Sequence, residues 1–166
     1  MDKVITLNVN GRDYTYTIGN CLGQIPESET LVETLRNRMG LTGTKLSCGE
    51  GACGCCAVLM DDKAVASCMM LTVECGGKKI VTIEGLRDRE TGKLDVIQEA
   101  FMEKNAFQCG FCTPGIIIAV KALLMANPNP TEEEIGEALS GNYCRCISHY
   151  QVVEAVKYAI DKLGGK

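Results

Sequence analysis

Eleven cysteines in 166 residues constrain this chain more than any other feature. Four of them lie within the nine-residue stretch CGEGACGCC, at positions 48–56, with three glycines between them. The amino terminus, MDKVITLNVNGRDYTY, is typical of a strand and not of an export signal, so we expect a reducing, cytoplasmic location. Cysteine clusters in such a compartment hold metals or carry redox chemistry more often than they form disulfides. The odd number of cysteines further weakens a complete disulfide framework.

The composition narrows the classes of protein and partner that fit this chain. Hydrophobic residues make up 46% of it, but there is no Trp and there are three Phe, so its cores must be mainly aliphatic. The net charge of −4 comes from 17 basic and 21 acidic residues scattered along the chain. Nucleic acid requires a basic face, so we do not expect it as a partner. Membrane insertion is not expected either, because no run of about 18 apolar residues is present.

The amino-terminal half carries the pattern of a small mixed sheet crossed by one helix. Two alternating runs meet at Asn10 and Gly11, a strong short-range signal for a hairpin. A helical pattern at residues 31–39 is preceded by a capping box of Thr30 and Glu33. The stretch CAVLMDDKAVASC indicates a second hairpin, and KKIVTIEG indicates a last strand.

The character of the sequence changes near residue 85. A polar linker, GLRDRETGKLD, precedes four segments with helical apolar spacing and short connections. In the second of these segments we expect Thr113 as the cap and Pro114 at the first helical position. The sequence therefore predicts an α+β chain, with a domain at residues 1–84 followed by a four-helix bundle at residues 85–166.

The first group of cysteines has the spacing of a plant-type [2Fe–2S] site. Cys48, Cys53 and Cys56 follow C-x4-C-x2-C, and Cys68 comes after the second hairpin. Two irons bridged by two sulfides need two thiolates each, so one loop can supply three thiolates and a neighbouring strand the fourth. Glycines in the loop let backbone N–H groups turn toward the sulfurs, which tunes the potential. Cys55 is expected to be a bystander, because using it as a ligand would break the x2 spacing, although it could exchange into the site if Cys56 were removed.

The second group comprises Cys109, Cys112, Cys144 and Cys146, which form C-x2-C…C-x-C. Each pair stands just before a helical segment, and helix amino termini suit an anionic site, so two such ends could gather four thiolates. On spacing alone, the set could ligate zinc or iron about equally well. A thioredoxin-like pair at C-G-F-C is disfavoured because the flanking strand is missing. A Rieske centre needs two histidines, and His149 is the only one.

The two motifs in this order closely resemble the small iron–sulfur subunit of the molybdenum hydroxylases. That family includes xanthine dehydrogenase, aldehyde oxidoreductase, nicotinate dehydrogenase, carbon monoxide dehydrogenase and 4-hydroxybenzoyl-CoA reductase. The matching stretches are CGEGACGCC, QCGFCTPG and GNYCRC, and the resemblance covers nearly the whole chain. The sequence departs from the family where Cys55 replaces a small residue such as Ala. It departs again after the last cysteine pair, where residues 147–150 are Ile-Ser-His-Tyr and the family often has Thr-Gly-Tyr.

The resemblance implies a β-grasp ferredoxin-like domain at residues 1–84 and a four-helix bundle at residues 85–166, each with one [2Fe–2S] cluster. A large molybdopterin-binding subunit would lie beside the bundle cluster, and Gln108 and Cys146 would contact the pterin. Electrons would pass from molybdenum through both clusters to the FAD of a further subunit or to another acceptor, in a dimer of heterotrimers. The expected substrate of the complex is an N-heterocycle such as a purine or nicotinate, with an aldehyde, CO or an aromatic acyl-CoA as alternatives.

Two other interpretations stay open at the level of sequence. Zinc could fill two sites of four thiolates each, which would make the chain a zinc-stabilised interaction module. The chain could also be a free-standing ferredoxin whose carboxy-terminal part is a plain helical domain. We expect no independent active site under any of these interpretations, because no Ser/His/Asp set, acid pair or phosphate loop is evident.

Overall fold

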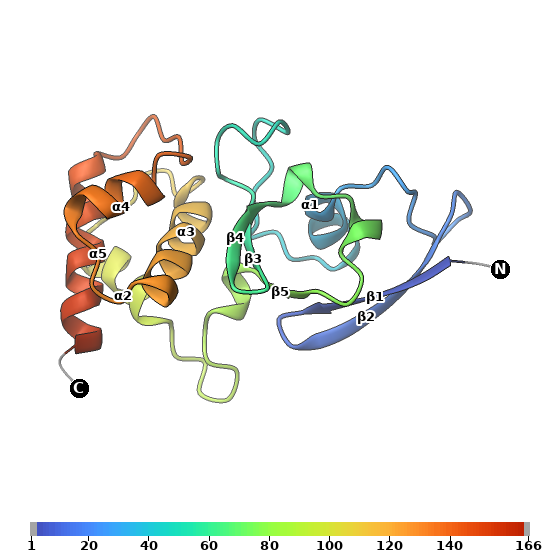
Figure 1. The fold of residues 1–166 in the computed structure, drawn as a ribbon, viewed down its shortest axis with the longest axis horizontal. Helices are drawn as coiled ribbons and strands as arrows, with labels where there is room; N and C mark the ends of the chain where they lie inside the picture. Colours follow the sequence, from blue (N-terminus) through green and yellow to red (C-terminus); the bar gives the residue numbers. More distant parts are fainter. Residues whose placement is uncertain (1–2, 165–166) are drawn as a thin grey trace.

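The computed structural model describes residues 3–164 as an α+β fold with a mixed sheet in the amino-terminal half and helices in the carboxy-terminal half (Figure 1). The strands are β1 (Lys3–Val9), β2 (Arg12–Ile18), β3 (Ala57–Met60), β4 (Lys63–Ala66) and β5 (Lys79–Val81). The α-helices are α1 (Leu31–Glu33), α2 (Val96–Glu103), α3 (Thr113–Ala126), α4 (Glu132–Ala138) and α5 (His149–Gly164). A π-helical turn, η1 (Thr34–Arg38), continues α1, and three 3-10 turns are η2 (Ser67–Met69), η3 (Thr72–Glu74) and η4 (Ile83–Gly85).

The sheet has the strand order β2-β1-β5-β3-β4, in which β1 and β5 run parallel and the other neighbours antiparallel. Both predicted hairpins are confirmed. The first turns at Asn10 and Gly11, with φ of 51° and 69°, and the second at Asp61 and Asp62, with φ of 47° and 67°. Positive φ at both central residues gives the turn a twist that matches the flanking strands.

One helical segment, α1 continued by η1, lies against the sheet (Figure 1). The predicted capping box is present, because the main-chain N–H of Thr30 donates to the carboxylate of Glu33 over 2.8 Å. Leu31 and Leu35 are fully buried in a core with side chains from the strands. Gly40 follows the segment with φ of 70°, a conformation that glycine adopts without strain.

The last strand is shorter than the sequence predicts. Strand β5 covers only Lys79–Val81, and residues 83–85 form the turn η4. The reason is a side chain from the first hairpin: Oδ1 of Asn10 accepts the N–H of Thr82 over 2.8 Å, and Nδ2 of Asn10 donates to Oγ1 of Thr82 over 2.9 Å. This side chain takes the place of a ladder partner, so the strand ends early.

The four helical segments predicted after residue 85 are present as α2, α3, α4 and α5. Helix α2 packs against α3 and α5, and α4 packs against α3 and α5, around a core that includes Phe101, Ile135 and Val156. The prediction for the start of α3 was wrong by one residue. Cys112 is the N-cap, so Thr113 is the first helical residue and Pro114 the second.

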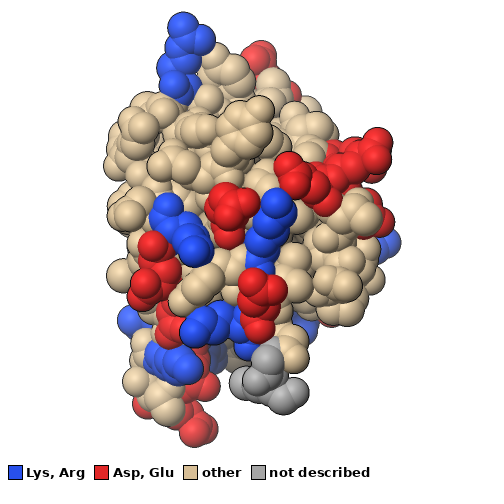
Figure 2. Space-filling model, turned by 90° about the vertical axis from the view of Figure 1, so that its left-hand side faces the viewer, with Lys and Arg blue, Asp and Glu red and all other residues tan. Residues whose placement is uncertain are grey.

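The outer face of the helical half carries acidic and basic side chains interspersed with one another over its lower part (Figure 2). Ion pairs on this half include Lys157 with Glu132, at 2.9 Å, which joins α5 to α4. Among residues 3–164, no helix is long and apolar enough to cross a membrane.

The helical half contacts the sheet through α3, which packs against β3 and β4 (Figure 1). Each half has its own hydrophobic core, and the two cores have no buried residue in common. The loop that carries Cys53 contacts the segment before α5 where the two halves meet. Some of the cysteines are exposed there and others are buried.

Candidate metal centres

The amino-terminal cysteine site consists of Cys48, Cys53, Cys56 and Cys68. Its loop turns sharply because Gly49, at φ of 72°, takes a conformation that other residues avoid. The turn directs the main-chain N–H of Glu50 at Sγ of Cys48 over 3.5 Å. That N–H and the thiol of Cys53 lower the pKa of the exposed Cys48 thiol to about 7. The loop thus presents donors to a sulfur, as the glycine pattern predicts.

Cys56 and Cys68 form the buried side of this site. The hairpin of β3 and β4 pairs Ala57 with Ala66, which brings the residue before β3 and the turn after β4 together. Cys56 is 2% exposed and Cys68 6% exposed, and both pack against Val32. Burial and the neighbouring Cys56 thiol raise the pKa of Cys68 to about 11.

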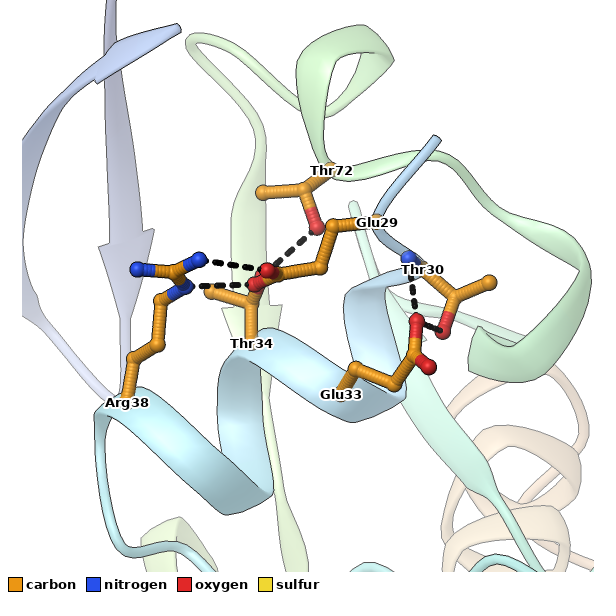
Figure 3. Close-up of polar contacts among 6 residues, drawn as sticks. All are labelled: Glu29, Thr30, Glu33, Thr34, Arg38 and Thr72. Atoms are coloured by element: carbon orange, nitrogen blue, oxygen red, sulfur yellow. Dashed lines mark hydrogen bonds and ion pairs between the residues drawn. The ribbon is translucent and has the colours of Figure 1, made fainter. Parts of the chain in front are cut away.

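A polar network holds the chain that follows Cys68 against the helical segment (Figure 3). Arg38 donates two hydrogen bonds of 2.6 Å to the carboxylate of Glu29. The hydroxyl of Thr34 donates to Glu29 over 2.6 Å and lies 2.8 Å from the hydroxyl of Thr72. The main-chain N–H of Thr72 in turn donates to the carbonyl of Glu29 over 2.9 Å. The network therefore positions the segment that follows Cys68.

The carboxy-terminal cysteine site consists of Cys109, Cys112, Cys144 and Cys146. The starts of α3 and α5 bring the two sequence pairs together, so that Sγ of Cys146 lies 3.8 Å from Sγ of Cys109. Burial and the neighbouring thiol of Cys144 raise the pKa of Cys112 to about 12. The main-chain N–H of Ile147 donates to Sγ of Cys144 over 3.4 Å. Cys109 and Cys146 are exposed, whereas Cys112 is buried.

In both sites the thiols lie in pairs. Within residues 3–164, no three His, Cys, Asp or Glu side chains converge closely enough to hold a single metal ion. A [2Fe–2S] cluster does not need such a site, because it binds two thiolates at each of two irons. The neighbouring pairs are Cys48 with Cys53 and Cys56 with Cys68 in one site, and Cys109 with Cys146 and Cys112 with Cys144 in the other. This donor set fits two binuclear clusters.

The other residues singled out in the sequence lie apart from these pairs. Cys55 is 5% exposed, its Sγ faces the carbonyl of Cys53 over 3.9 Å, and burial raises its pKa to about 12. Cys75 is buried and donates to the carbonyl of Leu71, and Cys21 is exposed. Gln108 is exposed directly before Cys109, and His149 is the first residue of α5.

Exposed apolar side chains border each site. Next to Cys109, Phe107 is 41% exposed and Phe111 45% exposed. Phe107 also lines an apolar groove of about 300 Å³ together with Met102 and Pro114. Beside the other site, Met69 is 60% exposed and lies against Gly51. Each site therefore reaches the surface next to an apolar rim.

Sequence reasoning missed the contact between the two sites. The main-chain N–H of Tyr143 donates to the carbonyl of Cys53 over 3.0 Å. Nδ2 of Asn142 donates to the carbonyl of Gly54 over 3.4 Å. These residues are some ninety positions apart in the chain, and no local pattern pairs them.

Comparisons with known proteins agree with the division of the cysteines into two sites. Residues 23–79 match the 2Fe–2S iron–sulfur cluster binding domain, and residues 82–157 match the [2Fe–2S] binding domain. The fold and sites thus define an iron–sulfur protein with two [2Fe–2S] binding domains. This result decides against the zinc module and against a ferredoxin with a plain helical domain.

Individual similar proteins identify the family within this class of iron–sulfur proteins. The small subunit of nicotine 6-hydroxylase from Paenarthrobacter nicotinovorans is 46% identical over 166 residues, covering 99% of this chain and 94% of that protein. The small FeS subunit of nicotinate dehydrogenase from Eubacterium barkeri is 40% identical over 163 residues, covering 98% of each. A chain of quinoline 2-oxidoreductase from Pseudomonas putida 86 superposes with a TM-score of 0.86 at 34% identity, covering 99% of this chain and 98% of that one. The chain belongs to the family of small iron–sulfur subunits of molybdenum hydroxylases.

Proposed function

We propose that this chain relays electrons within a molybdenum-dependent hydroxylase or dehydrogenase that acts on an N-heterocycle. The observation that carries the proposal is the arrangement of eight thiols as two sets of two pairs, which suits two electron-carrying [2Fe–2S] clusters. The substrate class is supported by the relatives, whose names specify nicotine, nicotinate and quinoline. All three compounds contain an aromatic nitrogen ring.

We assign each cluster to one domain. Residues 1–84 form a β-grasp ferredoxin-like domain, and residues 85–166 form a four-helix bundle. The separate hydrophobic cores of the two halves support this division. The ligands of the first cluster are Cys48, Cys53, Cys56 and Cys68. The ligands of the second are Cys109, Cys112, Cys144 and Cys146.

The residues of the chain hold and tune the clusters, and each cluster supplies one-electron chemistry. The cysteines bind as thiolates, and the N–H groups of Glu50 and Ile147 face two of the sulfurs. Hydrogen bonds of this kind stabilise the more negative, reduced form and raise the potential. The exposure of Cys109 and Cys146 supports a second cluster that lies close to a partner surface.

We place the partners at the two apolar rims. A large molybdopterin-binding subunit docks at the rim of Phe107 and Phe111, where Gln108 and Cys146 contact the pterin. An FAD-binding subunit docks at the opposite site, beside Met69. The complete assembly is a dimer of heterotrimers in the cytoplasm, a reducing compartment in which the cysteines outside the clusters stay as thiols.

Metal analysis of anaerobically purified complex tests the assignment. About four irons and four sulfides are expected for each copy of this chain, with two distinct paramagnetic signals after full reduction. Cys144→Ser should remove about half of the iron and one signal. Cys21→Ser, a change at an exposed cysteine outside both sites, should remove none. If Cys144→Ser keeps all of its iron and both signals, the assignment of the second cluster is wrong.

The substrate class has its own test. With nicotinate, nicotine or a purine as the electron donor, purified complex should reduce an artificial dye. When the dye is left out, the same substrate should reduce the clusters and bleach their visible absorption. If the complex oxidises aldehydes but neither nicotinate, nicotine nor a purine, this part of the proposal is wrong.

A further inference from the structure

A small cavity lies beside the carboxy-terminal cysteine site, between the start of α3, the end of α4 and the start of α5. Its volume is about 90 Å³. Apolar side chains of Ile116, Leu139 and Val152 and polar side chains of Asn142, Cys144 and His149 line it. Among the four proposed ligands of the second cluster, only Cys144 lines this cavity. The cavity is therefore separate from the space between the four sulfurs, and it adjoins the site at one thiol.

The cavity has the size and the polar groups that bound water requires. A water molecule takes about 30 Å³ in the liquid, so about three fit into this volume. Nδ2 of Asn142 donates to the carbonyl of Gly54 over 3.4 Å, which leaves Oδ1 as an acceptor. The neutral imidazole of His149 offers one donor and one acceptor. Together with the sulfur of Cys144, these groups are the partners that distinguish a wet cavity from a dry, apolar one.

The four sulfurs of this site have different surroundings. Cys109 and Cys146 are exposed, whereas Cys112 is buried in the helical core. Cys144 is half-buried, and its Sγ receives the main-chain N–H of Ile147 over 3.4 Å. The cavity thus reaches the one inner thiol that already has a hydrogen-bond donor.

His149 stands at the boundary between this cavity and the bulk solvent. It is the first residue of α5, it is exposed, and it also lines the cavity. It is the only histidine in the chain, and no step of the proposed function uses it. A substitution at this position therefore changes the polar lining of the cavity without touching a proposed ligand.

We propose that His149 and Asn142 hold water in this cavity, and that this water donates a hydrogen bond to the sulfur of Cys144 and raises the reduction potential of the second cluster. The inference rests on the proposed function. Reduction adds one electron to the cluster, and part of the added negative charge lies on the sulfurs. Hydrogen bonds to the sulfurs and access of solvent both set the potential, because a donor stabilises this charge. His149 is a positioning residue that acts through water and forms no bond to iron.

The test compares His149→Phe with His149→Gln in the complete complex at one pH. Phenylalanine keeps a ring and removes both polar nitrogens, whereas glutamine keeps a donor and an acceptor. Redox titration followed by EPR measures the potential of the second cluster. We expect His149→Phe to lower the equilibrium constant for its reduction about tenfold, which corresponds to about 59 mV for one electron. His149→Gln should recover most of this loss.

Tyr150→Phe is the matched control for these variants. Tyr150 is the next residue along the chain, it is 78% exposed, and it does not line the cavity. This change also removes a polar group from α5, but the potential of the second cluster should stay at the wild-type value. The potential of the first cluster, measured in the same titration, should be the same in all of the variants.

Water labelled with oxygen-17 detects the bound water directly. Its hyperfine coupling to the reduced second cluster should be present in the unchanged protein, weaker in His149→Phe and retained in His149→Gln. The N–H of Ile147 contains no oxygen and does not contribute to this coupling. A wild-type potential in His149→Phe would overturn the proposal. A lowered potential with an unchanged coupling would also overturn it, because the ring and not the water would then act on the cluster.

Iron analysis separates this inference from the proposed function. Variants with about four irons and both signals leave the proposed function intact, whatever their potentials. If His149→Phe loses the second cluster, Val152→Ile replaces it, because one added methylene narrows the cavity and removes no polar group. Val152→Ile should lower both the potential and the coupling. Wild-type values of both in this variant would reject the proposal.

Discussion

The cysteines of this chain show how surroundings divide one residue type into different roles. Cys48 is exposed and receives a main-chain N–H, so its pKa falls to about 7. Cys68 and Cys112 are buried beside other thiols, and their pKa values rise to about 11 and about 12. Cys55 is also buried, but its sulfur faces a carbonyl and the helical core. Spacing predicts the ligand set, whereas burial and neighbouring groups set the pKa of each thiol.

The direction of the Cys55 side chain leads to a prediction about ligand exchange. We expect Cys56→Ala to lose the amino-terminal cluster, because the Cys55 thiol packs into the helical core and cannot replace the missing ligand. Iron should fall from about four to about two per chain, and Cys55→Ala should leave it unchanged. Iron and sulfide analysis checks this prediction, and full iron in Cys56→Ala would show that Cys55 had exchanged.

The carboxylate of Glu29 leads to a prediction about pH. Its hydrogen bonds from Arg38 lower its pKa, so the folded state favours the charged form. This contribution to stability is fully present above the ordinary value of 4.5 and is lost as the pH falls through the lower, folded-state value. We expect Glu29→Gln to lower the unfolding free energy by about 1–2 kcal/mol at pH 7, and by less at pH 4.

Urea unfolding followed by circular dichroism measures this difference at the two pH values. Lys79→Gln is the control, because it removes the exposed pair with Asp62, whose side chains are 62% and 54% exposed. Such pairs contribute little, so the midpoint should not move. A gap between Glu29→Gln and the unchanged protein that is the same at both pH values would contradict the prediction.

Among the helices, strands and turns, the sequence predicted those features that depend on neighbouring residues. The hairpin at Asn10 and Gly11 and the capping box at Thr30 follow from local residues, and both are present. The end of β5 was missed because Asn10, far away in the chain, provides the partner of Thr82. The close approach of Gly115, in the first turn of α3, to the backbone of Gly54 was missed for the same reason. A glycine fits the start of a helix equally well whether or not another loop lies against it.

The N-cap of helix α2 leads to a prediction about stability. Asp95 caps the helix by accepting the N–H of Ile97 over 3.0 Å, and it also pairs with Lys121 of α3 at 2.6 Å. Asp95→Ala removes both contacts and should cost about 1–2 kcal/mol for the cap alone. Asp95→Asn keeps a good cap and loses only the charge, so we expect a smaller loss. Thermal unfolding compares the two variants, and equal losses would show that the cap contributes nothing.

The whole molecule combines two separately packed cores with close backbone contacts between the cysteine sites. Helix α3 connects these features, since it begins at Cys112, carries Gly115 and packs against β3 and β4. Each site also opens beside its own apolar rim. In this layout the two sites lie close together within the molecule, while each has its own exposed edge at the surface.

The exposed edges of the two sites predict separate docking surfaces, and single substitutions can distinguish them. Phe111 is 45% exposed next to the carboxy-terminal site, and Met69 is 60% exposed next to the amino-terminal site. A carboxylate buried in an apolar interface loses its hydration without gaining a partner. We expect Phe111→Glu to weaken binding of the large subunit by about 2 kcal/mol or more. Met69→Glu should weaken binding of the flavin subunit in the same way.

Met125→Glu is the matched control for both variants. Met125 is 48% exposed near the end of α3, about 20 Å along the helix axis from Cys112. Co-purification with an affinity tag on this chain measures which subunits stay bound, and iron analysis confirms that each variant keeps its clusters. Loss of both partners in all three variants would mean that an added charge disrupts the fold. If only Met69→Glu loses the large subunit, the two docking surfaces are assigned the wrong way round. The large subunit then covers the rim beside Met69, because a buried carboxylate weakens binding only where the partner covers it.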